Sequence, residues 1–250
     1  MLSQIQMCIR DRVYALNACL AALVIWALVH WRYSTSPNWT VVAGVAFGVA
    51  LGNHLTIIWL APLVAICLIM PPVEPVKRVR AVAGFALATC AGLLVYVYLP
   101  LAAAANPSVN WGNPQTGAGF WWVVSGQLYR PLAFSVGWPE ALSRLFAWSS
   151  LLWREFLPWG VALALAGLAW LWQSDRLIAL GMLVSLALGL CWAIGYDTTD
   201  SLLTLLPGWV MIALWIGLGM VWLLNLLLRT GKRAAMATGL IVLALSLIHI

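Results

Sequence analysis

Long runs of apolar residues with hardly a charge among them restrict the folds open to this sequence more than any other feature. A helix needs about 20 apolar residues to cross a hydrocarbon core about 30 Å thick. Runs of roughly that length cover residues 13–31, 81–99, 156–172, 177–196 and 202–228. The composition, 64% hydrophobic and 8% charged, lies far from the about 45–50% and about 25% of soluble domains. We therefore predict an all-α polytopic transmembrane helix bundle.

The apolar run at 39–70 is too long for one span, because 32 residues would extend about 48 Å as a helix. We interpret it as two short helices broken at Gly52-Asn53-His54, with one tilted helix as the alternative. This interpretation gives about seven spans. A further run that starts at Ala234 predicts a truncated eighth span.

The two ends of the chain have an unusual sequence. Residues 245–250, LSLIHI, and residues 7–12, MCIRDR, match translations of a transposase mosaic-end adapter used to prepare sequencing libraries and of its reverse complement. We therefore expect residues 1–12 and 245–250 to be adapter-derived segments that pack poorly. Residues 13–244 are expected to form one membrane domain, a fragment of a protein that is longer at both ends.

The distribution of basic residues predicts which loops share a membrane face, because cytoplasmic loops collect Lys and Arg. One face is predicted to carry eight bases: Arg32, Lys77, Arg78, Arg80, Arg176, Arg229, Lys232 and Arg233. The other is predicted to carry Arg130, Arg144 and Arg154 with four acids, Glu140, Glu155, Asp197 and Asp200. The first face is assigned to the cytoplasm, and the chain is predicted to be a multi-pass membrane protein.

A long loop, residues 101–152, lies on the predicted non-cytoplasmic face. It opens with the turn-rich NPSVNWGNPQTG. Its later part, WPEALSRLFAWSSLLWREF, begins with a Pro-Glu helix start and carries Trp138, Trp148 and Trp153. These features predict a helix that lies in the membrane interface.

Several function classes find little support. The net charge of +6 is dispersed, so no basic tract indicates nucleic acid. Cysteines outside the ends lie singly in apolar runs, and no metal site or cofactor is evident. The predicted spans have no Asp, Glu, Lys or Arg near their centres, which disfavours an ion-coupled transporter. Polar residues inside the spans are expected to form interhelical hydrogen bonds: Asn17, Thr56, Thr89, Ser185 and Asn225.

His54 is the first candidate for chemistry, since it lies beside Asn53 at the predicted helix break. The two side chains can satisfy backbone groups freed by the turn. Alternatively, the turn faces a non-cytoplasmic cavity and contacts a phosphate or a sugar, because a histidine can donate a hydrogen bond to a phosphate oxygen.

The long loop supplies the other candidates. Aromatic faces bind sugar rings, amides bind hydroxyls and guanidinium groups bind phosphate. The same residue types also form turn caps and interface anchors. Asp197 and Asp200 in GYDTTDS are either paired carboxylates at a membrane exit or solvated loop acids. The predicted substrate-binding residues are Asn53, His54, Asn110, Trp111, Gln127, Tyr129, Arg130 and Asp197.

Four ordered stretches carry a family resemblance: VYALN (13–17), LGNHLT (51–56), VYLPLAAAANPSVNWGNP (97–114) and SGQLYR (125–130). The set resembles a large bacterial family of multi-pass membrane proteins of unknown function. That family is similar to the endoplasmic-reticulum protein O-mannosyltransferase and falls in the GT-C superfamily of glycosyltransferases.

The resemblance implies transfer of a sugar, with mannose as the first candidate, from a polyprenyl-phosphate carrier to a protein or glycan acceptor on the non-cytoplasmic face. It also implies that the catalytic carboxylate, the expected general base, belongs to a loop upstream of this chain, which would leave the fragment itself inactive. The chain has Ala102 and Asn113 where the family tends to have Arg and Asp. The alternative function is a non-catalytic transporter or flippase for a lipid-linked glycan, with the break at His54 as a discontinuous-helix site.

Overall fold

The computed structural model describes residues 2–230 and 239, with side chains from residue 13 onward. In this part of the chain every regular element is helical, as predicted. The α-helices are α1 (Leu2–Ser34), α2 (Asn38–Asn53), α3 (Ala61–Ile69), α4 (Pro75–Gly92), α5 (Tyr98–Ala104), α6 (Gly117–Val124), α7 (Trp138–Ser174), α8 (Arg176–Gly195) and α9 (Leu206–Thr230). The 3-10 helices are η1 (Leu55–Leu60), η2 (Leu93–Val97), η3 (Gln127–Leu132) and η4 (Ser201–Leu205).

The contacts divide the chain into two compact units. The first comprises Met1–Phe146 with Leu180–Val210, and the second comprises Ala147–Ala179 with Met211–Ile250. The expected poor packing of residues 1–12 and 245–250 lies outside the described side chains. So does the predicted truncated span that starts at Ala234.

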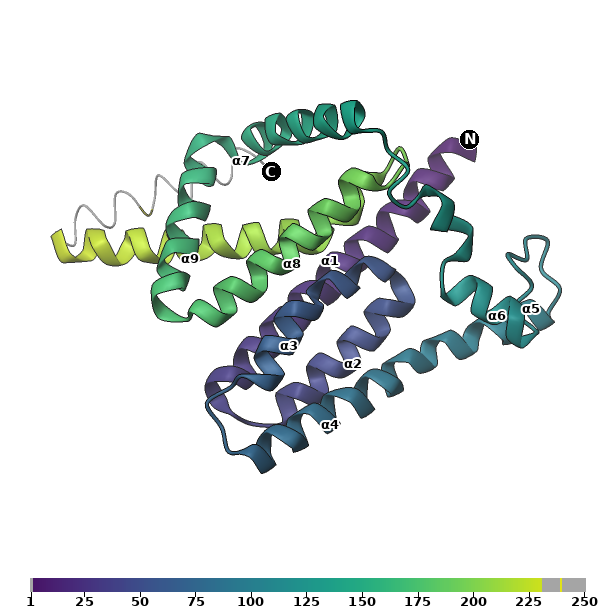
Figure 1. Cartoon of the computed structure of the whole chain (residues 1–250), viewed down its shortest axis with the longest axis horizontal. Helices are drawn as coiled ribbons and strands as arrows, with labels where there is room; N and C mark the ends of the chain where they lie inside the picture. Colours follow the sequence, from purple (N-terminus) through teal and green to yellow (C-terminus); the bar gives the residue numbers. More distant parts are fainter. Residues whose placement is uncertain (1, 231–238, 240–250) are drawn as a thin grey trace. The chain divides into compact units, whose positions relative to one another are not determined.

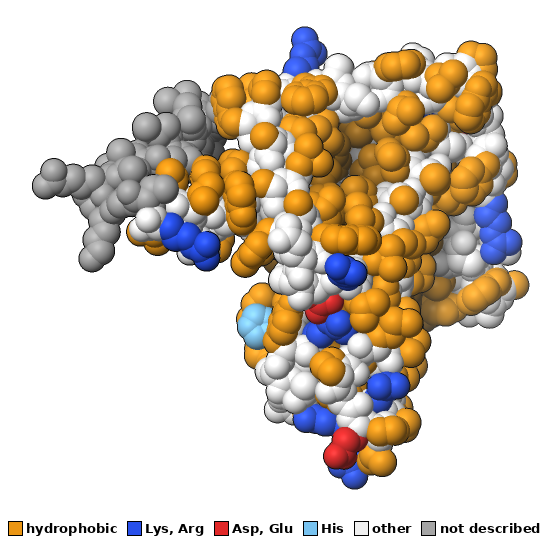
Figure 2. Space-filling model, turned by 60° about the vertical axis from the view of Figure 1, so that its left-hand side comes forward, with side chains coloured by type: hydrophobic (Ala, Val, Ile, Leu, Met, Phe, Trp, Pro, Cys, Tyr) orange, Lys and Arg blue, Asp and Glu red, His pale blue; other side chains and the backbone are white. Residues whose placement is uncertain are grey.

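The predicted spans are confirmed as helices. Five helices of the described part are long and apolar enough to cross a membrane: Val13–Ser34, Pro75–Ala104, Trp138–Ser174, Arg176–Gly195 and Ser201–Arg229. Hydrophobic side chains also cover most of the face drawn in Figure 2, where charged side chains are few. An integral membrane protein accounts for both observations, because exposed apolar surface is stable in lipid and costly in water.

The predicted break in the run 39–70 is also confirmed. Helix α2 ends at Asn53, His54 is extended (φ −156°, ψ 124°), and η1 with α3 forms a second apolar helical stretch, Leu55–Ile69. Helix α2 packs between α1 and α4 (Figure 1). The alternative of one tilted helix is therefore wrong.

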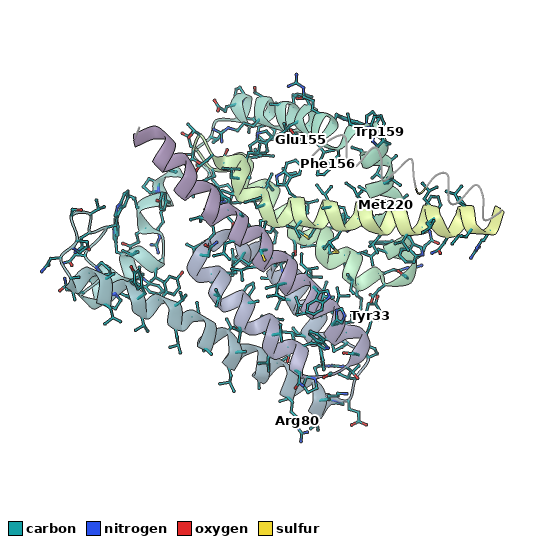
Figure 3. The ribbon with its side chains drawn as sticks, turned by 180° about the vertical axis from the view of Figure 1, so that it is seen from behind. Tyr33, Arg80, Glu155, Phe156, Trp159 and Met220 are labelled. Atoms are coloured by element: carbon teal, nitrogen blue, oxygen red, sulfur yellow. The ribbon has the colours of Figure 1, made fainter. Side chains whose placement is uncertain are left out.

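Two boundaries differ from the prediction. The span expected at 81–99 extends over Pro75–Ala104, because Pro75 starts α4 and the helical turns continue through η2 and α5. Helix α7 combines the interface helix predicted in the loop 101–152 with the span predicted at 156–172. It is kinked at Leu157 (φ 56°, ψ 164°), where the following Pro158 excludes regular helix. Glu155, Phe156 and Trp159 flank this kink (Figure 3).

Glycines let α2 and α4 approach closely. A Cβ atom at Gly48 would lie 2.9 Å from the Cα of Gly92 and would collide with the carbonyl oxygen of Thr89. A Cβ atom at Gly44 would lie 2.8 Å from the Cβ of Ala88. Small residues at such spacing are common where membrane helices pack backbone to backbone. This seam fixes the position of the α2 C-terminus, which precedes His54.

Some of the polar residues in the spans form the predicted hydrogen bonds between helices. The Nδ2 of Asn17 in α1 donates to the Oγ1 of Thr56 in η1 at 3.3 Å, and the backbone N–H of Leu63 in α3 donates to the Oγ of Ser185 in α8 at 3.4 Å. These bonds between helical segments were predicted. Thr89 instead donates to the carbonyl of Phe85 in its own helix at 2.9 Å, a local bond that threonine hydroxyls readily form.

Candidate functional site

A polar cluster of Tyr14, His54 and Asp200 lies in the first unit, built from three segments that are far apart in the sequence. The hydroxyl of Tyr14, on α1, donates to the Oδ2 of Asp200 at 2.9 Å. The rings of Tyr14 and His54 lie 5.6 Å apart between centroids. Asp200 precedes η4, and His54 is the break between α2 and η1. We call these residues the Tyr14–His54–Asp200 cluster.

The hydrogen bonds around His54 determine its tautomer. The backbone N–H of Thr56 donates to the Nδ1 of His54 at 3.4 Å, so Nδ1 is an acceptor. The hydroxyl of Thr56 lies 2.8 Å from the same nitrogen, and it can donate there while it accepts from Asn17. We therefore assign the proton of neutral His54 to Nε2. Nε2 has no hydrogen-bond partner among the described residues.

Burial and charge set the protonation of the cluster. Burial lowers the pKa of His54 below its usual 6.5, and the nearby Asp200 carboxylate opposes that shift. Burial also raises the pKa of Tyr196, and the neighbouring Tyr129 and Asp200 add to that increase. At neutral pH His54 and Tyr196 are therefore uncharged. Asp200 contributes the negative charge.

The SGQLYR segment reaches the same region. Gly126 has a positive φ of 61°, and a Cβ there would lie 3.3 Å from the Cδ1 of Leu55, the residue that follows His54. At the end of η3, the carbonyl of Leu132 accepts from the backbone N–H of Asp197 at 2.9 Å. Tyr129 lies between these two contacts in sequence, on the segment that they hold beside Leu55 and Asp197.

Arg144 holds the loop that carries Asp197 and Asp200. Its Nη1 donates to the carbonyl of Tyr196 at 2.7 Å, and its Nη2 lies 3.3 Å from the Oδ1 of Asp197. The carbonyl of Tyr196 follows the C-terminus of α8, where a positive side chain is favourable. Asp197, which was predicted to bind substrate, is thus engaged in an ion pair. Asp200 instead accepts from the hydroxyl of Tyr14.

The other predicted residues are distributed as follows. Asn53 donates from Nδ2 to the carbonyl of Val13 at 3.0 Å and ties α2 to α1, as expected for an amide that satisfies freed backbone groups. Asn110 donates to the Oδ1 of Asn113 at 3.2 Å within its own loop. Trp111 is 63% exposed in that loop. Gln127 is partly buried and Arg130 is exposed, both on η3.

The structure thus brings together His54, the Asp197–Asp200 loop and the segment that carries Tyr129. No described contact joins Asn110 or Trp111 to them. The sequence interpretation missed Tyr14 as a site residue and treated Asp200 mainly as a loop acid. The available signal was weak: Tyr14 and Asn17 both occur in VYALN, three residues apart and near one face of a helix.

Neither a metal site nor the cavity of the second unit involves the predicted site residues in the described part of the chain. No group of three or more His, Cys, Asp or Glu side chains there could hold a metal ion. The second unit has an open cavity of about 700 Å³ lined by Trp170, Trp222, Asn225, Leu226, Leu228 and Arg229. None of the predicted site residues lines it.

Comparison with known families adds one match. The model of the protein O-mannosyl-transferase TMEM260 N-terminal domain matches residues 5–76. This part of the chain is O-mannosyltransferase-like. The region similar to TMEM260 contains Tyr14, Asn17, Asn53, His54 and Thr56, and therefore most of the hydrogen-bonded surroundings of His54. No curated protein and no solved structure matches the chain.

Proposed function

We propose that the chain is part of a GT-C membrane glycosyltransferase that transfers a sugar, with mannose as the first candidate, from a polyprenyl-phosphate carrier to a protein or glycan. The transfer takes place on the non-cytoplasmic face of a bacterial inner membrane. The observation that carries the proposal is the O-mannosyltransferase-like match over residues 5–76, which contains Tyr14 and His54. The structure adds Asp200 and the segment from Gly126 to Leu132 to the same region.

The residue types suit a lipid-linked sugar. Tyr14 provides an aromatic face and a hydroxyl bonded to the Asp200 carboxylate, and Tyr196 and Tyr129 add two further aromatic rings on the neighbouring segments. Arg130 is an exposed guanidinium on η3, and phosphate is the usual partner of such a group. Both kinds of contact are needed for a donor that joins a neutral sugar to a charged phosphate.

Donor capture tests the proposal directly. The chain is placed in nanodiscs with a photoreactive polyprenyl-phosphate mannose, and cross-linking is measured with and without unlabelled competitor. We expect competed labelling that falls about tenfold in Arg130→Ala, since a charge-assisted phosphate contact contributes about 1.5–3 kcal/mol. The yield should not change, because an exposed arginine contributes little to folding.

Arg80→Ala is the matched control, because Arg80 is also exposed but lies near the N-terminal end of α4 (Figure 3). Labelling that Arg130→Ala and Arg80→Ala reduce equally would reject the phosphate assignment. The discontinuous helix at His54 is the observation that favours the transporter or flippase. Accelerated movement of a fluorescent lipid-linked glycan across proteoliposomes would support that function instead.

Sidedness is tested separately with single cysteines at Lys77 and Trp111 in a background without native cysteine. Lys77 lies in the first turn of the Pro75–Ala104 span, and Trp111 follows its other end. A helix of 30 residues is about 45 Å long and crosses the bilayer. We expect a membrane-impermeant maleimide to label position 111 in intact spheroplasts and position 77 only after permeabilisation. Labelling of both in intact spheroplasts would contradict the topology.

A further inference from the structure

The charge of the Tyr14–His54–Asp200 cluster decides which part of a lipid-linked sugar it can accept. His54 is neutral, because its Nδ1 accepts hydrogen bonds and burial lowers its pKa. Tyr14 is a neutral donor to Asp200, which leaves the Asp200 carboxylate as the charge of the cluster. Arg144 on α7, which donates to the carbonyl of Tyr196 beside this loop, is already paired with Asp197 and Glu140. A phosphate placed here would face the like charge of Asp200, and among the described residues no cation bonded to the cluster would compensate it.

The free hydrogen-bonding groups fit a different ligand. The Nε2–H of His54 is a donor, and the Oδ1 of Asp200 is an acceptor without a hydrogen-bond partner among the described residues. A hydroxyl group satisfies both, because it donates one hydrogen bond and accepts others. Phosphate oxygens at neutral pH act mainly as acceptors and leave Asp200 unsatisfied.

Buried polar atoms without partners flank the cluster. Within the described part of the chain they include the Oδ1 of Asn17, the Oγ of Ser125 and the Oγ1 of Thr198. Asn17 has no exposed surface and bonds through Nδ2 to Thr56, the partner of His54. Thr198 lies two residues before Asp200, and Ser125 precedes the glycine that packs on Leu55. Such groups are rare in folded proteins and indicate a missing partner.

We infer that the Tyr14–His54–Asp200 cluster binds hydroxyl groups of the sugar and that the phosphate of the donor is bound elsewhere. This inference rests on the proposed function and makes it more specific. Of the two ligands predicted for His54, a phosphate and a sugar, the inference selects the sugar. Asp200 becomes the residue that distinguishes a glycosylated carrier from a bare one, and Tyr14 becomes a positioning residue that orients the carboxylate.

The test compares two probes on the intact chain in nanodiscs: a short-chain polyprenyl-phosphate mannose and the same polyprenyl phosphate without sugar. Binding is followed by the change in tryptophan fluorescence. Asp200→Asn should weaken binding of the mannosylated probe at least tenfold. It should leave binding of the bare phosphate unchanged or tighter, because a negative charge is removed. Glu140→Gln is the control, since Glu140 is an exposed acid that contacts only Arg144 among the described residues.

His54→Gln provides a second variant if Asp200→Asn does not fold. The glutamine amide oxygen can still accept from the backbone N–H of Thr56. Its N–H donors, however, do not occupy the position of the His54 Nε2–H. We therefore again expect weaker binding of the mannosylated probe and unchanged binding of the bare phosphate. Equal weakening of both probes by either folded variant would overturn the inference. Equal binding of the two probes by the wild-type chain would also overturn the inference, but it would remain consistent with the proposed binding of a polyprenyl-phosphate carrier. Wild-type chain that binds neither probe would reject the proposed function and the inference together.

Discussion

Replacement of Gly48 by valine is expected to prevent stable packing of α2 against α4. The new Cβ would collide with the carbonyl oxygen of Thr89 and lie within 3.0 Å of the backbone N of Leu93. These are backbone atoms of the partner helix, so no side-chain rotation can relieve the overlap. Overpacking costs typically about 1–3 kcal/mol and more where backbone must move. We expect a loss of about 3 kcal/mol or more, and a Tm lower by about 6–12 °C.

Thermal unfolding of the detergent-purified chain, followed by size-exclusion chromatography, measures this effect. Gly84→Ala is the matched control in the same helix pair. A Cβ at Gly84 meets its nearest atom, the Oγ1 of Thr40, at 3.5 Å, which is ordinary van der Waals contact. Alanine also favours helix over glycine by up to about 1 kcal/mol, so this variant should be as stable as the wild type or more stable. Similar losses in both variants would show that the glycine seam is not tightly packed.

Arg144→Met is expected to release the loop that carries Asp197 and Asp200. The Arg144 side chain is only 15% exposed and donates to the carbonyl of Tyr196 at 2.7 Å. Methionine keeps most of the length and apolar surface but removes every donor. Hydrogen bonds from a charged group contribute about 1.5–3 kcal/mol. Local opening should therefore become about 10- to 100-fold more frequent.

Amide hydrogen exchange of peptides that cover residues 196–201 measures that opening. Glu140→Gln is again the control, because its carboxylate is 62% exposed and pairs with Arg144 on the surface. Exposed ion pairs contribute about 0–1 kcal/mol, so exchange in this variant should change little. The assignment of Arg144 would be wrong if exchange at 196–201 were the same in Arg144→Met and in the wild type.

Local signals predicted much of the fold. Apolar run lengths located the spans, and the polar Gly52-Asn53-His54 in an overlong run located the break between α2 and η1. The Pro-Glu helix start located the first part of α7. Sequence patterns could not show that Gly44 and Gly48 face residues 85–92 of α4, because the choice of partner helix depends on packing between distant segments.

In the candidate site too, local signals could be read from the sequence and contacts between distant segments could not. His54 was predicted because a histidine beside a helix break is visible locally. The bond from Tyr14 to Asp200 joins residues 186 positions apart, and nothing local indicates such a pair. Asp197 was predicted to bind substrate and Asp200 was not, although both occur in the same GYDTTDS segment. They differ because Arg144 pairs with the first, while the second faces the cluster.

The shortness of the two helices that meet at His54 has a consequence for depth. Helix α2 has 16 residues and η1 with α3 has six and nine, so the two stretches are about 24 Å and about 26 Å long. At their other ends, Arg32 donates to the carbonyl of Met70 and Lys77 donates to Thr35, which places charged groups there. A hydrocarbon layer about 30 Å thick must then thin by about 4–6 Å or leave the turn at His54 recessed. A lipid-borne substrate would meet these polar groups without rising out of the bilayer.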